Sequence, residues 1–469
     1  MTSRSGEKAP AADPDTVEDT LLGLADPGDA ALEPDVALSE RGPSKLRALA
    51  SSLSAKEGLA RNVVMMVIWQ GANYLAPLLT FPHLARTLHP AGFGKFGVYL
   101  LIASWMTIVS DWGTNMTGAR AIAQAKARDG AIEAPFWNIF LLRIAVVAIV
   151  LAGVLAYLLA TRASGEEWLL LLAAWSVILG NALTVSWCLQ GLERLDGFAT
   201  AALVGRLAAV PATILLVQRA DQVWLAIAIQ GFGGLVIGLV SILILYRSRR
   251  IRHFSASLGG IVEEARGGLP IFLTTVSHGL YSSTATLMLG WLQGPAATGI
   301  FVAADRLRLA AQNVVQPLGQ AIFPRVSRLV VTDRPAAVRL IRLWAMGQIT
   351  VMGLGSLMLA MLSPFVVEIV AGKAFAASAG VLAILAPVIA VYACNNVLGR
   401  QTLMPFGHDK AYGRIGVATA VVNVCVMPPL VYWWGAKGAA LGVLVTEGFV
   451  LVCCLAVIRR HRILAISPR

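Results

Sequence analysis

Four arginines lie within apolar stretches of the sequence, where a charge is costly: Arg143, Arg206, Arg306 and Arg308. A charged side chain at the centre of a bilayer costs roughly 3 kcal/mol or more, so such residues face a protein interior or a water-filled cavity. A guanidinium group stays charged and matches phosphate oxygens with a planar fork. Several arginines around one cavity therefore predict an anionic, phosphate-bearing cargo, with Asp111 and Asp305 as resting counter-ions. Buried salt bridges that fix helix packing are the alternative.

The stretch around Arg308 carries a polar face. Its polar residues recur in steps of three and four, which places them on one side of a helix: Asp305, Arg308, Gln312, Gln316 and Gln320. Weaker stripes occur in three other stretches, at Gln70, Asn73, Pro77 and Thr80, at Thr107, Asp111, Thr114 and Gly118, and at Thr274, His278 and Ser282. In hydrocarbon these faces must turn inward, so they predict a shared polar cavity. Hydrogen bonds between packed helices are the alternative, and His278 is either a proton carrier or a neutral hydrogen-bonded side chain.

The chain as a whole has the amino-acid composition of a membrane protein. The chain of 469 residues is 57% hydrophobic and 14% charged, whereas soluble domains have roughly 25% charged residues. Apolar runs of about 20 residues, the length that crosses a bilayer as a helix, occur at 62–84, 95–117, 136–160, 167–189, 199–217, 222–246, 269–291, 298–322, 338–361, 377–399, 411–433 and 438–458. The sequence therefore predicts an all-α integral membrane protein with about twelve transmembrane helices.

The placement of basic residues predicts the orientation of these helices. If the N-terminus is inside, the even-numbered connections and the C-terminal tail carry most of the basic residues, and the opposite loops carry mainly isolated charges. By the positive-inside rule both termini are cytoplasmic. The net charge of +12 is mostly this topology signal, so it requires no nucleic-acid partner.

The first 60 residues read as a cytoplasmic tail. Residues 1–40 carry ten acids and two bases with no helical or strand period, which is typical of a disordered segment. Residues 41–61 carry five bases and one acid. This second part is either in contact with the anionic inner leaflet or a solvated linker.

An internal repeat divides the remaining chain. The segment "PAGFGKF", residues 90–96, matches "PAATGIF", residues 295–301, at Pro, Ala, Gly and Phe with an offset of 205 residues. At the same offset Arg120 falls on Arg325 and Asn73 on His278. Internal repeats are typical of transporter folds. We therefore expect two pseudo-symmetric six-helix bundles, residues 61–250 and 251–469, the second bundle ending in a short basic cytoplasmic tail.

The sequence gives little indication of a cysteine-based site or of nucleotide binding. The five cysteines, Cys188, Cys394, Cys425, Cys453 and Cys454, show neither CxxC spacing nor histidine partners at metal-ligand spacing. No GxxxxGK[ST] nucleotide-binding motif occurs. These features predict a protein that needs no cofactor, so any energy must come from an ion gradient carried by H⁺ or Na⁺, from the membrane potential or from downstream consumption of the product.

Two motifs carry a resemblance to a known family. The segment "DWGTNMTGARAIA", residues 111–123, and the segment "GIFVAADRLRLAAQNVVQPLGQAIFPRVSR", residues 299–328, resemble the second and eighth helices of the Wzx-type polysaccharide (O-antigen) flippases. These belong to the multidrug/oligosaccharidyl-lipid/polysaccharide exporter superfamily. Together with the twelve spans, the resemblance covers residues 62–458. Asp111, Arg120, Arg306 and Arg325 match charges that recur in the family, whereas Asp305 is a departure that would partly neutralise the lumen.

The resemblance implies that the two six-helix bundles surround a central cationic lumen, and it also implies a function and a location. Such a protein would carry an undecaprenyl-diphosphate-linked oligosaccharide from the inner to the outer leaflet of the bacterial inner membrane by alternating access. Membrane lipids and the machinery of polysaccharide polymerisation and export would be its partners. The alternatives are a multidrug or metabolite antiporter of the same superfamily, a membrane polymerase or ligase acting on lipid-linked sugars, and a scaffold in an export complex. The short external loops disfavour an enzyme, and the excess of in-span arginines over acids disfavours a cationic cargo.

Overall fold

The structure is a computed structural model that describes residues 42–128, 130–248, 251, 253–313, 316–461 and 463. The side chains of residues 42–75, 195–197, 277, 278, 280–282, 316–318, 320 and 321 lie outside this description. The expected acidic tail, residues 1–40, lies outside it as well. The chain divides into two compact units, Met1–Gly58 and Leu59–Arg469. The helix contacts and the cavity lie in the second unit.

All regular structure in the described part of the chain is helical. The elements are α1 (Gly42–Asp111), α2 (Thr114–Ala127), α3 (Glu133–Ala160), α4 (Gly165–Leu183), α5 (Ser186–Gly191), α6 (Leu195–Leu216), α7 (Val223–Arg247), α8 (Leu258–Leu292), α9 (Gly294–Asn313), α10 (Gln316–Thr332), α11 (Arg334–Met361), α12 (Ser363–Ala371), η1 (Lys373–Phe375), α13 (Ala376–Asn395), η2 (Asn396–Leu403, a π-helix) and α14 (Asp409–Arg460). Each of the apolar stretches in the sequence falls on one helix or on two consecutive helices.

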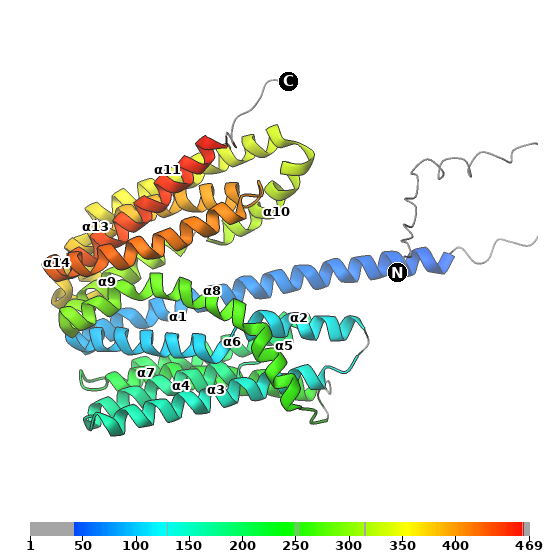
Figure 1. Cartoon of the computed structure of the whole chain (residues 1–469), viewed down its shortest axis with the longest axis horizontal. Helices are drawn as coiled ribbons and strands as arrows, with labels where there is room; N and C mark the ends of the chain where they lie inside the picture. Colours follow the sequence, from blue (N-terminus) through cyan, green and yellow to red (C-terminus); the bar gives the residue numbers. More distant parts are fainter. Residues whose placement is uncertain are drawn as a thin grey trace, which may run out of the picture. The chain divides into compact units, whose positions relative to one another are not determined.

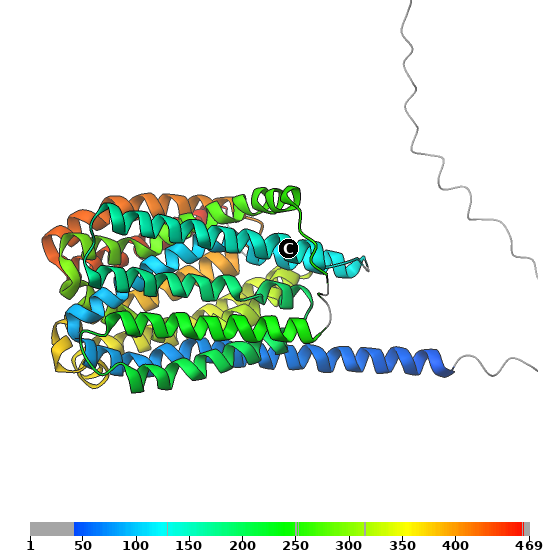
Figure 2. The same cartoon turned by 90° about the horizontal axis from the view of Figure 1, so that it is seen from below.

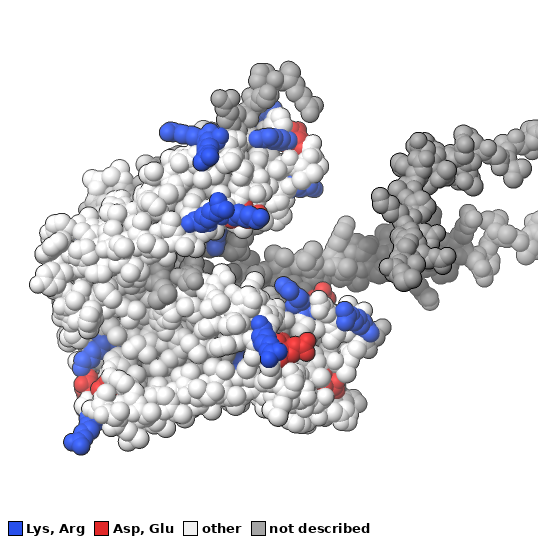
Figure 3. All heavy atoms as spheres, in the orientation of Figure 1, with Lys and Arg blue, Asp and Glu red and all other residues white. Residues whose placement is uncertain are grey.

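The protein is an all-helical membrane protein. Eight helical stretches in the described residues are long and apolar enough to cross a membrane: Ala76–Ala127, Glu133–Ala160, Gly165–Gly191, Phe198–Leu216, Val223–Arg247, Arg334–Met361, Lys373–Leu403 and Asp409–Arg460. The first and the last of these have 52 residues each. Figure 3 shows the charged side chains of one face gathered toward the ends of the helices, with uncharged surface between them. This is the distribution expected where a hydrocarbon layer surrounds the helices.

Polar side chains define where several helices begin. The hydroxyl of Ser164 accepts the Glu167 backbone N–H before α4, and the Ser257 hydroxyl accepts the Gly260 N–H at 3.0 Å before α8. The carboxylate of Asp333 accepts the Ala336 N–H at 2.9 Å before α11. Such N-caps satisfy donors that the first helical turn leaves open, and each stabilises its helix by about 1 kcal/mol.

The helices pack in two groups. Within α1–α7, helix α7 packs on α4 and α6, and α5 packs on α2; within α8–α14, helix α13 packs on α9, α11 and α14, and α8 packs on α14. Figures 1 and 2 show the helices of each group running beside one another. Helix α8 also contacts α2 and α3. It therefore joins the two groups.

Helices α1 and α9 cross at backbone contact distance. A Cβ atom on Gly94 would lie 1.8 Å from the Pro295 carbonyl oxygen, and one on Gly299 would lie 1.9 Å from the Pro90 carbonyl oxygen. The two contacts are reciprocal, because Gly94 and Pro90 correspond to Gly299 and Pro295 at the 205-residue offset. The residue before each proline has a positive φ, 55° at His89 and 79° at Gly294. Equivalent positions of the repeat therefore share a positive φ before the proline, and the equivalent glycines lie at the same helix crossing.

Candidate functional site

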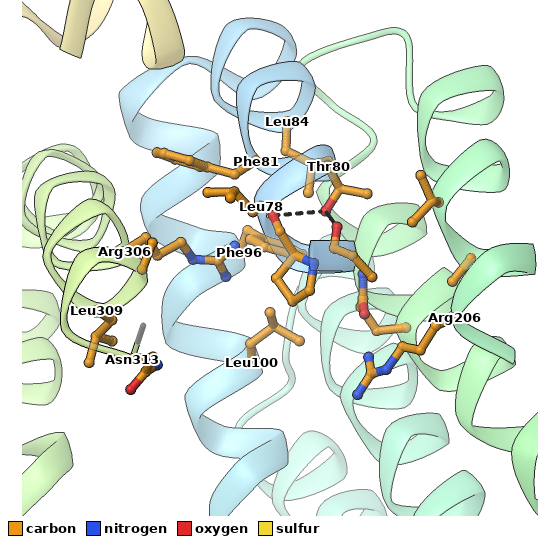
Figure 4. A pocket seen from close by; sticks show the side chains of 16 residues that line it. Leu78, Thr80, Phe81, Leu84, Phe96, Leu100, Arg206, Arg306, Leu309 and Asn313 are labelled. Carbon is orange, nitrogen blue, oxygen red and sulfur yellow. Dashed lines mark hydrogen bonds between the residues drawn. The ribbon is translucent and has the colours of Figure 1, made fainter. Parts of the chain in front are cut away.

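A cavity of about 450 Å³ lies between α1, α6, α7 and α9. Eleven of its sixteen lining residues are apolar, among them Phe81, Phe96, Leu100 and Leu309. The other five are Thr80, Arg206, Gln230, Arg306 and Asn313. Figure 4 shows Arg306 and Arg206 on opposite walls. The residues come from distant parts of the chain, so only the folded protein forms this site.

Helix α9 supplies one wall with a single face. Arg306, Leu309, Ala310 and Asn313 line the cavity, and their spacing of three, four and seven residues places them on one side of the helix. The predicted stripe of Asp305 and Arg308 lies on another side, because at about 100° per residue these two positions lie about 100° and about 160° around the helix from Arg306. The lining face is thus distinct from the polar stripe that the sequence emphasised.

Arg306 is partly buried and lies against two aromatic rings. Its Cζ atom is 5.3 Å from the ring centroids of both Phe93 and Phe96. This is within the range of cation–π attraction, which contributes about 0.5 to 2 kcal/mol depending on desolvation. Among the described residues, no carboxylate forms an ion pair with Arg306. The rings therefore hold the positive charge in place without an ion pair, and the neighbouring Asp305 carboxylate offsets it only through space.

Arg206 is the second cation of the cavity. Its side chain is partly buried on α6, and its Nε atom is buried without a hydrogen-bond partner in the described part of the chain. A buried N–H without a partner costs free energy until an acceptor arrives. The amide of Gln230 on α7 lines the same cavity. This wall therefore offers hydrogen-bond donors to a ligand.

The cavity has an excess of positive charge. Two arginines line it, and none of the described lining residues is Asp or Glu. Charge-assisted hydrogen bonds from guanidinium to phosphate or carboxylate oxygens are about twice as strong as neutral ones. In a low-dielectric surrounding an unpaired cation attracts an anion far more strongly than in water. The arrangement can bind an anionic group whose neighbouring parts are apolar or hydroxylated.

The other predicted charges of α9 form a closed network. Arg308 donates from Nε to the Asp305 carboxylate at 2.7 Å and from Nη1 to the Gln312 amide oxygen at 2.5 Å. Arg308 and Gln312 are buried, at 8% and 7% exposure. The spacing rule thus found a real polar stripe. Its described members, Asp305, Arg308 and Gln312, form one hydrogen-bonded network, and they are not among the residues that line the cavity.

Asp111 and Arg143 form a second closed network. Arg143 on α3 forms an ion pair with Asp111, and its Nε and Nη2 atoms donate to Thr114 at 2.8 Å and Asn115 at 3.1 Å. Its Nη1 atom donates to the carbonyl oxygen of Thr184 at 3.3 Å. The network surrounds the break between α1 and α2, where Trp112 and Gly113 have positive φ values of 47° and 76°. Neither Asp111 nor Arg143 lines the cavity.

The structure does not describe the side chains of three predicted site residues: Asn73, His278 and Gln316. Their assignment to the lumen remains a prediction. The two rings against Arg306, Phe93 and Phe96, were not predicted as site residues, and neither were the polar lining residues Gln230 and Asn313. The helical spacing from Arg306 to Asn313 was a usable signal for the last of these. Among the described residues, no three His, Cys, Asp or Glu side chains converge to hold a metal ion.

Comparisons with known proteins agree with this architecture. The chain is 29% identical over 409 residues to a candidate O-antigen transporter of Escherichia coli (strain K12), covering 87% of this chain and 99% of that protein. A candidate O-antigen transporter of Shigella dysenteriae is 25% identical over 403 residues, covering 86% of this chain and 100% of that protein.

Solved structures show a similar fold at low sequence identity. An inward-facing multidrug resistance MATE family transporter of the MOP superfamily superposes with a TM-score of 0.57 at 15% identity, covering 86% of this chain and 98% of that chain. The lipid II flippase MurJ, in an inward closed conformation, superposes with a TM-score of 0.56 at 13% identity, covering 84% of this chain and 87% of that chain. The family model described as "Polysaccharide biosynthesis protein" matches residues 59–330. This match covers more than half of the sequence, so the chain belongs to the polysaccharide biosynthesis protein family.

Proposed function

We propose that this protein moves a polyprenyl-diphosphate-linked oligosaccharide from the inner to the outer leaflet of the bacterial cytoplasmic membrane. The observation that carries the proposal is the cavity with Arg206 and Arg306 on opposite walls and no carboxylate among its described lining residues. A diphosphate cannot enter hydrocarbon without partners, because an unpaired buried charge is prohibitively costly. The two guanidinium groups would lower that cost during the crossing.

The remaining lining suits the rest of such a cargo. Thr80, Gln230 and Asn313 can exchange hydrogen bonds with sugar hydroxyls. Apolar residues such as Leu78 and Leu309 border them and can contact the first isoprenoid units. The names of the two relatives, which describe O-antigen transport, support the same class of cargo. The identity of the glycan is not part of this proposal.

We also propose twelve crossings in two pseudo-symmetric bundles of six. A helix of 52 residues would be about 78 Å long, more than twice the roughly 30 Å hydrocarbon core. Each 52-residue stretch is interrupted by a non-helical residue, His89 in one and Gly435 in the other. Two crossings in each, together with α8 and the α9–α10 pair, bring the eight candidate stretches to twelve. The reciprocal contacts of Gly94 and Gly299 support a two-fold relation between the bundles 61–250 and 251–469.

The orientation follows from the charge distribution. We place both termini and the loop between α7 and α8 in the cytoplasm, because basic residues accumulate on that side. Single cysteines introduced at the exposed positions Ser255 and Gln293, which flank α8 at its two ends, should react oppositely with a membrane-impermeant maleimide in intact cells. Labelling of Ser255→Cys from outside would overturn this orientation.

The energy source also remains a proposal. The chain shows no nucleotide-binding motif, so we expect coupling to H⁺ or Na⁺, to the membrane potential, or to removal of the product by the polysaccharide polymerase and export machinery. A scan of export against pH and sodium gradients in inverted vesicles separates these sources.

A second candidate is export of drugs or metabolites, which the fold shared with the MATE transporter favours. Fold similarity alone does not carry function. A cavity for cationic drugs needs acidic lining residues, and the described lining has none. The second candidate is therefore restricted to anionic or neutral small molecules.

The decisive experiment compares alanine variants of the two cavity arginines in cells that depend on this protein for surface polysaccharide. Arg206→Ala and Arg306→Ala should each cause lipid-linked oligosaccharide to accumulate on the inner leaflet, after normalisation to folded protein in the membrane. Arg339→Ala on α11 is the matched control, because Arg339 is exposed and lies outside the cavity lining. Normal export by a folded Arg206→Ala/Arg306→Ala protein would remove the cavity from the mechanism.

A further inference from the structure

We infer that Phe93 and Phe96 are positioning residues for Arg306, and that they act across the boundary between the two helix groups. Both phenylalanines belong to α1, whereas Arg306 belongs to α9. The anion site of the cavity is then complete only while α1 and α9 are in contact at the Gly94–Gly299 crossing. This inference deepens the proposed function and rests on it.

The contact geometry identifies the two rings as the groups that orient Arg306. Its Cζ atom is 5.3 Å from each ring centroid. The rings carry the negative face of an aromatic quadrupole, which attracts a guanidinium group. No described side chain forms an ion pair with Arg306. The neighbouring Asp305 carboxylate attracts it electrostatically, but that carboxylate accepts its hydrogen bond from Arg308. The rings therefore fix the direction in which the guanidinium group enters the cavity.

The rings are themselves held rigidly. Phe93 and Phe96 are 0% and 1% exposed, and their centroids are 5.9 Å apart. Phe93 also contacts Phe81 at 5.4 Å and, edge to face, Phe375 at 5.7 Å. Such packed aromatic groups have few alternative rotamers. A rigid support is what a positioning residue requires, because a displacement of about 1 Å at a binding group is costly.

The glycine crossing explains how α1 reaches Arg306. A Cβ atom on Gly94 would meet the backbone oxygen of Pro295, and one on Gly97 would lie 3.1 Å from the side chain of Val302. Small residues allow helices in membranes to approach closely. The phenylalanines lie in the same turns of α1 as these glycines. Separation of the two helices would therefore withdraw the rings from Arg306.

The repeat shows that this contact is a specific addition to a symmetric scaffold. At the 205-residue offset Phe96 corresponds to Phe301, which is also buried, at 2% exposure. Arg306 corresponds to Leu101, an uncharged residue. Phe93 corresponds to Thr298, so the second half repeats only one of the two rings and lacks the cation. Phe301 is the matched control for Phe96.

The arrangement ties anion affinity to conformation. If the rings hold Arg306 in its binding direction only when α1 and α9 touch, an anion binds this state more tightly than a state in which they are apart. By linkage, the bound anion then stabilises the contact, and its release favours separation. The cargo would thus keep the crossing closed while its diphosphate is on Arg306.

The test uses the purified full-length protein in detergent micelles and titrates it with farnesyl diphosphate, a water-soluble prenyl diphosphate. Phe93→Leu and Phe96→Leu keep apolar volume but remove the quadrupole. Each should weaken the affinity by about twofold to thirtyfold, the range of a cation–π contribution of about 0.5 to 2 kcal/mol. Phe96→Trp should retain the affinity, and Phe301→Leu should leave it unchanged. Because Phe93 is not a lining residue, its variant tests positioning without loss of a direct contact.

A double-mutant comparison separates positioning from a structural role. In an Arg306→Ala background, Phe93→Leu and Phe96→Leu should have no further effect on affinity, because the group that they orient is gone. Equal weakening in both backgrounds, or equal weakening by Phe301→Leu, would overturn the inference while the proposed function stands. If Arg306→Ala itself leaves the affinity unchanged, the proposed function fails at this site. Equal affinity in the parent and in both leucine variants would also overturn the inference.

Discussion

Arg143 and Asp111 form an ion pair between α3 and the end of α1, in which the arginine side chain is 1% exposed and the aspartate side chain 22%. The guanidinium group also donates to Thr114, Asn115 and the carbonyl oxygen of Thr184. A single side chain thereby connects α1, α2, α3 and the end of α4. We infer that Arg143 stabilises the break between α1 and α2 and does not contact the cargo.

Removal of Arg143 should therefore lower the amount of folded protein. Arg143→Ala leaves Asp111 without its partner and should destabilise the fold by about 3 to 5 kcal/mol. Arg143→Lys should recover little of this lost stability, because an ammonium group cannot donate hydrogen bonds to all four acceptors in these directions. The measurement is the monodisperse fraction after extraction into mild detergent. An Arg143→Ala protein that is fully folded but inactive would instead place Arg143 in the transport path.

The crossing of α1 and α9 gives a prediction about glycine. Gly94→Ala and Gly299→Ala each place a methyl group on a backbone oxygen, so the helices must move apart at a cost of about 1 to 3 kcal/mol or more. Gly153→Ala on α3 is the control, because nothing lies within 4 Å of its Cβ position, and it should slightly stabilise its helix. Thermal unfolding of the three variants in detergent tests this ranking. Equal midpoints for Gly94→Ala and Gly153→Ala would contradict the close crossing.

The sequence predicted those features that depend on local periodicity. Runs of apolar residues identified the helices, and steps of three and four identified the Asp305, Arg308 and Gln312 network, because residues at these intervals are neighbours on any helix. The offset of 205 residues similarly identified Gly94 and Gly299 as equivalent. The sequence did not show that these two glycines contact each other.

The composition of the cavity could not be predicted, because it depends on which helices become neighbours. Arg143, Arg206 and Arg306 look alike in the sequence, each an arginine within an apolar stretch. Only the fold brings Asp111 to the first and leaves the other two beside an open cavity. The same applies to Phe93 and Phe96, whose contact with Arg306 joins positions more than 200 residues apart.

Glu264 on α8, before the apolar part of that helix, should make stability depend on pH. Burial raises the pKa of its carboxyl above the ordinary value of 4.5, and the charge of Glu263 adds to this. A raised pKa favours folding below the unfolded pKa, and this advantage is lost as pH rises through the folded value. Glu264→Gln should therefore raise the unfolding midpoint at pH 7 and have little effect near pH 4. A midpoint unchanged at pH 7 would contradict a desolvated carboxyl.

Glu193 should give the opposite dependence of stability on pH and therefore serves as a control for Glu264. A hydrogen bond from Lys126 lowers the pKa of its carboxyl, and the two groups are 2.8 Å apart. A lowered pKa contributes stability above the unfolded value, and this contribution is lost as pH falls through the folded value. Glu193→Gln should therefore lower the midpoint slightly at pH 7 and not near pH 3. The effect is small because the Glu193 side chain is 79% exposed and solvent screens the pair.

The two neighbouring arginines of α9 should respond in opposite ways to substitution. Arg308 is paired with Asp305 and Gln312 inside the protein, so Arg308→Ala strands a half-buried carboxylate and should reduce the folded amount. Asp305→Asn/Arg308→Met removes both charges and should recover most of that loss. Arg306 has no ionic partner among the described residues. Arg306→Ala removes its contact with the two rings but also the cost of burying a charge, so the unfolding midpoint of the free protein should change only slightly. Arg306→Ala should instead abolish the rise in midpoint that saturating farnesyl diphosphate gives the parent protein, since a ligand stabilises only the state that binds it. A full rise in midpoint for the Arg306→Ala protein would assign the anion site to another residue.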